Sequence, residues 1–183
     1  TADNLLRSWG YQPSYFRYPF LHRGKTSKKI SSIRSQILSK GYQDGFVTVD
    51  NYDWYIDQLF QKAIKANQEI NFDKLKSFYV ETLYKGIVHY ENLAIRVYGR
   101  SPKHVMLLHE NDLAALFVKD LISFLKLRGW EICTPAESYN DPDLIKYPKN
   151  ILRHGQGRVV AHATEKDFAK PLLSGFEDEE VLD

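Results

Sequence analysis

Apolar residues recur along the chain with two different periods, and together these predict an alternation of helices and strands. Helical spacing of apolar residues predicts helices over residues 2–9, 27–40, 55–66, 73–98 and 112–127, with a short one at 135–139. Short unbroken apolar or aromatic runs predict buried strands at residues 15–18, 45–49, 103–108 and 130–133. This alternation is typical of an α/β fold, in which parallel strands are covered by helices.

The pattern divides the chain into a folded part, residues 1–141, and an irregular C-terminal extension, residues 142–183. The extension is rich in proline and glycine and carries an acidic run at residues 177–180. About four parallel strands would leave two sheet edges exposed, which folded domains tolerate poorly. The chain also opens in what reads as the last turns of a helix closed by Gly10. Both observations predict that an N-terminal part of the domain is missing.

Two of the predicted strands carry residues able to do chemistry. The apolar run 105–108 is followed at once by His109, and Asn111 or Asp112 can then cap a helix. The aromatic run 15–18 contains Arg17. Ligands of α/β proteins bind outside the carboxyl ends of the strands, so His109 and Arg17 are the first candidates for a site. The alternatives are a hydrogen-bonded core histidine and a structural ion pair.

Composition narrows the classes of partner. A formal net charge of +2 over 183 residues points neither to nucleic acid nor to an acidic partner. The basic residues between Arg23 and Arg34 fall on one predicted helix, which favours a solvated face over a phosphate-binding one. Cys133 is the single cysteine, which excludes an intrachain disulfide and a cysteine zinc cluster. No stretch approaches the roughly 20 apolar residues of a membrane span.

Four segments, taken in order, resemble motifs of a known family. They are the runs 16–20 (FRYPF), 50–54 (DNYDW), 107–111 (LLHEN) and 125–131 (LKLRGWE). Together they resemble the later half of the polysaccharide deacetylases, carbohydrate esterase family 4. In that family an arginine-x-proline-aromatic motif precedes an aspartate-tryptophan motif and a leucine-x-histidine motif. The resemblance covers residues 1–141 and implies the C-terminal half of a distorted (β/α) barrel.

The resemblance also implies roles for individual residues. His109 would be the acid that protonates the leaving amine or alkoxide, and Arg17 would orient the catalytic aspartate. Asp53 would hold Arg17, Trp54 would wall the site, and Leu107 would line the pocket for the acetyl methyl group. The remaining residues expected to contact substrate are Tyr18 and Phe20, while Asp50 is the rival to Asp53 if the register differs.

The family's metal-binding motifs are absent from this sequence. It has no Asp-Asp pair, and no two of its histidines are four residues apart. We therefore expect no family-type metal in this chain alone. A divalent ion such as zinc is expected only where an N-terminal segment or a second chain completes the barrel.

The function implied is part of a hydrolase that removes acetyl groups from a carbohydrate by metal-assisted hydrolysis of an amide or an ester. An alternative from another class is a non-catalytic module that binds glycan or protein through an open sheet edge. A nucleic-acid binder that uses the basic helix is a third and less favoured reading. An envelope or secreted location is suggested by the resemblance alone.

Overall fold

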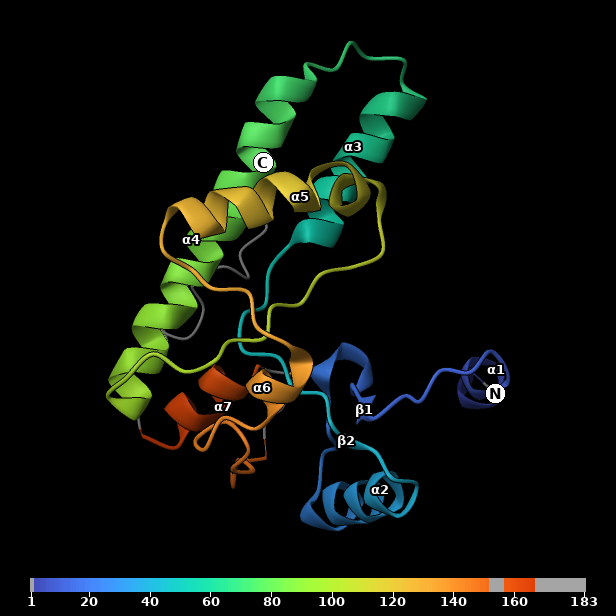
Figure 1. Cartoon of the computed structure of the whole chain (residues 1–183), viewed down its shortest axis with the longest axis vertical. Coiled ribbons are helices and arrows are strands. Elements are labelled where there is room, and N and C mark those ends of the chain that lie inside the picture. Colours follow the sequence, from blue (N-terminus) through green and yellow to red (C-terminus); the bar gives the residue numbers. More distant parts are fainter. Residues whose placement is uncertain (1, 152–156, 167–183) are drawn as a thin grey trace.

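The computed structural model describes residues 2–151 and 157–166, and this part of the chain is mostly helical (Figure 1). Its elements in order are α1 (Ala2–Ser8), β1 (Tyr15–Phe16), the 3-10 turn η1 (Pro19–Leu21), α2 (Ser27–Ser39), β2 (Gln43–Asp44), α3 (Asp53–Lys65), α4 (Phe72–Tyr98), α5 (Asp112–Leu127), α6 (Pro135–Tyr139) and α7 (Arg158–Thr164). β1 and β2 pair in parallel, with Tyr15 opposite Gln43 and Phe16 opposite Asp44.

The prediction of a partial (β/α) barrel is wrong, because the expected strands do not assemble into a sheet. The runs 45–49 and 103–108 meet at a single parallel bridge, between Val49 and Met106. Hydrogen bonds from Thr48 and Val49 to the carbonyl of Val105 extend this contact only slightly. In the described part of the chain, the run 130–133 forms no strand at all. A strand needs a neighbour to satisfy its backbone, so these runs do not form a sheet. Val105, Met106 and Trp130 pack against the core, whereas residues 131–133 are exposed.

The helix predictions are confirmed, and local capping explains the boundaries. The side chain of Thr26 accepts a hydrogen bond from the backbone N–H of Lys29 at the start of α2. Asn71 caps α4 in the same way. Gly99 ends α4 in the left-handed region, with φ of 75°, which a residue without Cβ adopts at little cost. α7 has no counterpart among the predicted elements, and the acidic run 177–180 lies outside the described residues.

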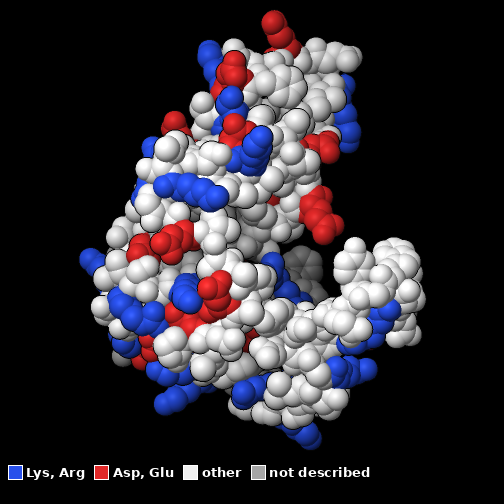
Figure 2. Space-filling model, viewed as in Figure 1, with Lys and Arg blue, Asp and Glu red and all other residues white. Residues whose placement is uncertain are grey.

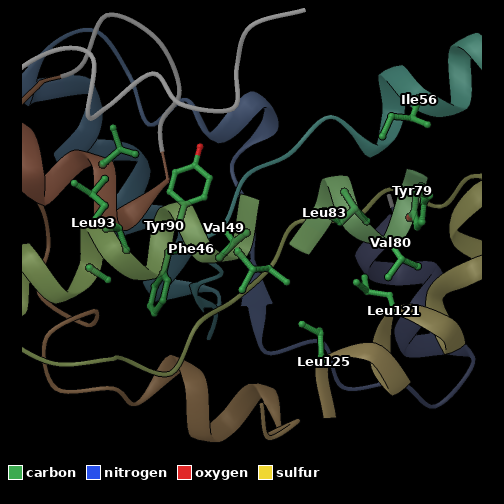
Figure 3. Close-up of a cluster of buried hydrophobic side chains, with 14 of the residues drawn as sticks. Phe46, Val49, Ile56, Tyr79, Val80, Leu83, Tyr90, Leu93, Leu121 and Leu125 are labelled. Atoms are coloured by element: carbon green, nitrogen blue, oxygen red, sulfur yellow. The ribbon is translucent and has the colours of Figure 1, made fainter. Parts of the chain in front are cut away.

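The core lies along α4, which α3, α5 and α7 cover (Figure 1). Tyr79 and Leu83 of α4 and Leu113 of α5 are fully buried. Figure 3 shows Val80 near Leu121 of α5, and Phe46 and Val49 of the segment after β2 between Tyr90 and Leu83. Each large apolar side chain buried in this way contributes roughly 1.5–3 kcal/mol to stability. The core therefore belongs mainly to the helices.

The elements α1, β1, α2 and β2 form a smaller lobe beside the helical body (Figure 1). α1 has no buried residue, and a hydrogen bond from the Tyr42 hydroxyl to Asp3 ties it to the lobe. None of the helices within residues 2–151 and 157–166 has the length and apolar character needed to cross a bilayer.

Candidate active site

Asp53 and His109 form a hydrogen-bonded pair where the chain enters α3 and α5. One carboxylate oxygen of Asp53 accepts a hydrogen bond from Nδ1 of His109 at 2.7 Å. The other accepts the backbone N–H of His109, also at 2.7 Å. The Asp53 side chain is fully buried, whereas 46% of the His109 side chain is exposed. The pair therefore presents a titratable ring to solvent from a fixed, buried carboxylate.

Two asparagines hold the loops that carry this pair. The amide of Asn51 donates to the carbonyl of Leu107 at 2.6 Å, and its oxygen accepts the backbone N–H of Asp53 at 2.9 Å. Asn111 caps α5 and points its amide at an Asp53 oxygen, 3.3 Å away. Sequence reasoning named Asn111 only as a possible cap and missed Asn51. The available signal was their position, two residues from Asp53 and His109 respectively.

Asp50 is a second carboxyl group near the pair. Burial raises the pKa of Asp50, although the backbone N–H of Asn51 and the nearby charges of His109 and Arg17 act in the opposite direction. The negative charge of Asp53 raises this pKa further. Asp50 is thus close enough to interact electrostatically with His109, Arg17 and Asp53. A carboxyl group with a raised pKa beside a histidine is a candidate proton carrier.

Arg17 is exposed at the edge of this region, and its partners differ from those expected. Its Nε donates to the carbonyl of Gly45 at 3.2 Å, and its Nη2 donates to the hydroxyl of Tyr139 at 3.2 Å. No hydrogen bond joins Arg17 to Asp53 in the described part of the chain, and the Asp53 oxygens accept from His109 and Asn111 instead. The guanidinium is held by two neutral acceptors, and it has no carboxylate partner among the described residues.

The four residues expected to bind substrate fall in different places. Trp54 follows Asp53 in the first turn of α3 and is 40% exposed. Leu107 is partly buried and supplies the carbonyl that Asn51 binds. Phe20 is 95% exposed in η1. Tyr18 is buried and faces another part of the molecule, described below. The structure therefore brings Trp54 and Leu107 to the pair but leaves Tyr18 away from it.

In the described part of the chain, no group of three His, Cys, Asp or Glu side chains is arranged to hold a metal ion. Nδ1 of His109 donates to Asp53, which leaves Nε2 as the accessible ring nitrogen. Proton transfer at Nε2 is one reaction that this arrangement allows.

Figure 2 shows a hollow between the body that carries α3 and α5 and the lobe that carries α1. The charged side chains visible on that lobe are basic. Comparisons of the chain with models of known families, with curated proteins and with solved structures find no match.

Proposed function

We propose that the chain is part of a hydrolase, similar to the polysaccharide deacetylases, that removes acetyl groups from a carbohydrate. In this proposal His109 gives a proton to the leaving amine or alkoxide. The observation that supports it most is the Asp53–His109 pair, in which a buried carboxylate holds a half-exposed imidazole. By contrast, His104 and His162 have both ring nitrogens hydrogen-bonded within the fold.

The pair has the geometry that acid–base chemistry requires. Hydrolysis of an acetyl group breaks the bond between its carbonyl carbon and the leaving nitrogen or oxygen, which then needs a proton. Because Nδ1 of His109 donates to Asp53, the transferable proton of the imidazolium sits on Nε2. Asp53 fixes the ring and stabilises the imidazolium, while its own charge stays buried. Positioned acids of this kind contribute about 10²- to 10⁴-fold in rate.

The neighbouring residues receive supporting roles in the same proposal. Arg17 carries a charge without a described carboxylate partner, so it can pair with an incoming catalytic aspartate or an oxyanion. Trp54 offers an exposed ring on which a sugar face can stack. Leu107 provides apolar surface beside the pair. Asp50 remains the second proton carrier.

The metal and the catalytic base must come from elsewhere if this function is right. We infer that an N-terminal segment or a second chain supplies the Asp-Asp and histidine-pair motifs, together with a divalent ion bound by them. The extended run 103–108 supports this, because Val49 and its neighbours satisfy only part of its backbone. A further strand added at this edge would pair the remaining groups.

The experiment is turnover of the complete protein with His109→Ala, using an N-acetylglucosamine oligomer and an acetylated xylan as substrates. We expect kcat to fall by at least about 100-fold, the scale of a lost general acid. Glu110→Ala, at the exposed neighbouring position, is the matched control and should keep near-normal turnover. Near-normal turnover of a folded His109→Ala variant would rule out the role of His109.

A second function is favoured by one observation, the exposed aromatic ring of Trp54, which packs against the rings of Tyr52 and Tyr55. In this alternative the chain is a non-catalytic module that binds glycan or protein. Calorimetric titration with the same oligosaccharides separates the two. Binding that Trp54→Ala abolishes and His109→Ala leaves intact, with no hydrolysis, would favour the module.

A further inference from the structure

A cluster of three arginines surrounds Tyr147, on a face that the proposed chemistry does not use. The guanidinium carbons of Arg34, Arg158 and Arg23 lie 4.1, 5.0 and 5.3 Å from the centre of the Tyr147 ring. They come from α2, from α7 and from the loop after η1. In the described part of the chain, the one carboxylate bound to this cluster is Asp44, which pairs with Arg158. Three positive charges therefore face one negative charge.

The charges in this cluster are poorly compensated by the protein itself. Arg158 is only 4% exposed, and it donates to Asp44 and to the carbonyl of Lys146. Burial lowers the pKa of Arg158; Asp44 counteracts this, whereas the positive charge of Arg23 lowers it further. Nη1 of Arg23 is buried without a hydrogen-bond partner among the described residues. An unpaired buried donor is unfavourable, so the cluster lacks an acceptor.

Two cavities flank the Asp44–Arg158 pair and give an acceptor room to bind. The larger has a volume of about 140 Å³, and its lining includes Arg34, Arg158 and the hydroxyl-bearing rings of Tyr18 and Tyr147. The smaller, of about 20 Å³, lies beside Arg23. A single water needs roughly 10–15 Å³ on the same measure. The larger cavity therefore accepts a polyatomic ion, and the smaller holds little more than a water.

The surrounding sequence supplies a field that attracts anions. Residues 4–43 contain eight lysines and arginines and no aspartate or glutamate. Figure 2 shows basic side chains across the lobe that carries α1 and α2. Such a field raises the local concentration of anions. Neither Asp53 nor His109 is among the residues that line the two cavities.

We propose that Arg34 and Arg158 bind a compact oxyanion, either free phosphate or the phosphoryl group of a small metabolite, in the larger cavity beside Asp44, while Arg23 adds positive charge from the neighbouring smaller cavity. Guanidinium groups bind such oxyanions through paired N–H donors. The hydroxyls of Tyr18 and Tyr147 lie 3.0 Å apart and one donates to the other, so the pair leaves one O–H donor at the cavity wall. The anion neutralises the surplus charge that Asp44 leaves. Nothing in this proposal requires hydrolytic activity.

The first experiment titrates the full chain with inorganic phosphate and, separately, with glucose 6-phosphate, in chloride buffer at constant ionic strength. We expect saturable binding by calorimetry and a rise in Tm. Arg34→Gln should weaken binding by about ten-fold, since it removes a charged donor from an exposed position that does not support the core. Lys28→Gln removes the same charge from the same helix but away from the cavity, and it should bind as the parent does.

The two ligands separate the two sources of the oxyanion. Tighter binding of phosphate assigns the site to the free ion, and tighter binding of glucose 6-phosphate assigns it to a phosphorylated metabolite. Absence of saturable binding by either would overturn the proposal. Equal losses in Arg34→Gln and Lys28→Gln would also overturn it, because they would show general charge attraction rather than a site.

Asp44→Asn tests the same site with a change that should strengthen phosphate binding rather than weaken it. It removes the one carboxylate bound to the cluster, so we expect a lower Tm without phosphate, tighter phosphate binding, and recovery of Tm when phosphate is added. If the lower Tm is not recovered by phosphate, the cluster is purely structural and the proposal fails.

Discussion

Asp44 and Asp53 lie on the same connection between the small lobe and the helical body, yet they meet very different partners. Asp44 pairs with Arg158 of α7, whose side chain is almost fully buried. Asp53 pairs with His109, whose ring is half exposed. Arginine keeps its charge at every accessible pH, whereas histidine titrates near neutrality. The first pair can hold elements together and attract anions, and the second can move a proton.

The surroundings of the two carboxylates sharpen this contrast. Asp53 is itself fully buried and accepts hydrogen bonds from the His109 ring, the His109 backbone and Asn111. Asp44 is partly accessible and stands alone among several cations. One carboxylate is therefore satisfied by the protein, while the other leaves positive charge in excess. This difference separates a site for chemistry from a site for binding.

The largest expected effect comes from breaking the buried pair. Arg158→Met should lower the free energy of unfolding by about 3–5 kcal/mol, because Asp44 and the carbonyl of Lys146 lose their partner in a buried place. Urea denaturation measures the loss. The double variant Asp44→Asn with Arg158→Met should recover part of it, since the orphaned charge is gone. A loss below about 1 kcal/mol in Arg158→Met would mean that the pair is not structural.

Asp53→Asn should lower the free energy of unfolding by about 2 kcal/mol, which is less than the loss in Arg158→Met. The side chain keeps its shape, and only one of its two accepting oxygens is lost. The amide of the new residue cannot accept both donors of His109, so the ring should turn or change tautomer. Urea denaturation gives the stability, and ¹⁵N chemical shifts of the imidazole report the tautomer. His109→Ala is the control and should cost less still, because its backbone N–H remains on Asp53. An unchanged tautomer in Asp53→Asn would show that the carboxylate does not determine which nitrogen of the His109 ring is protonated.

The sequence was informative where structure is local. The helices α2, α3, α4 and α5 follow from apolar spacing and from capping residues, and His109 and Asp53 were both named as candidates. Their pairing was not predicted, since it depends on the contact of Val49 with Met106 across distant parts of the chain. Arg17 was expected to bind Asp53 for the same reason: sequence order does not show which side chains meet.

The sheet and the arginine cluster show the other limits of the sequence. Apolar runs predicted strands, but a strand exists only when a neighbour pairs with it, and residues 103–108 find one bridge. α7 is short and buried on nearly every side, so it has no amphipathic period to detect. The partnership of Arg158 with Asp44 joins residues 114 positions apart. Because such a long-range pair cannot be read from the sequence, the basic residues near Arg34 were interpreted as a solvated helix face.

A smaller effect is a loss of stability at acidic pH, which we expect from His162 because this residue is buried near Arg158. In the neutral ring, Nδ1 accepts from the Tyr98 hydroxyl at 2.8 Å and Nε2 donates to the carbonyl of Lys146 at 3.1 Å. Burial, and then the charge of Arg158, lower the pKa of His162 below its ordinary value of 6.5. The unfolded chain thus takes up a proton near pH 6.5 while the folded chain takes it up only at lower pH.

Stability should therefore fall as the pH drops below 6.5, with an upper limit of about 1.4 kcal/mol per pH unit for one group. Urea denaturation at pH 7.5 and 5.5 measures the change, and His162→Gln should show a smaller difference between the two. Equal pH dependence in both proteins would mean that His162 titrates normally.

The smallest expected effect separates the ring of Tyr147 from its hydroxyl. Tyr147→Phe keeps the surface on which the arginines stack and removes only the hydrogen bond with Tyr18, so the loss should be about 0.5–1 kcal/mol. A double-mutant cycle with Tyr18→Phe should show that most of this loss is shared between the two hydroxyls. Phosphate affinity should fall by less than in Arg34→Gln, because the guanidinium groups supply the charge. A greater fall in affinity than in Arg34→Gln would make the hydroxyl pair, rather than the stacked cations, the main anchor of the anion.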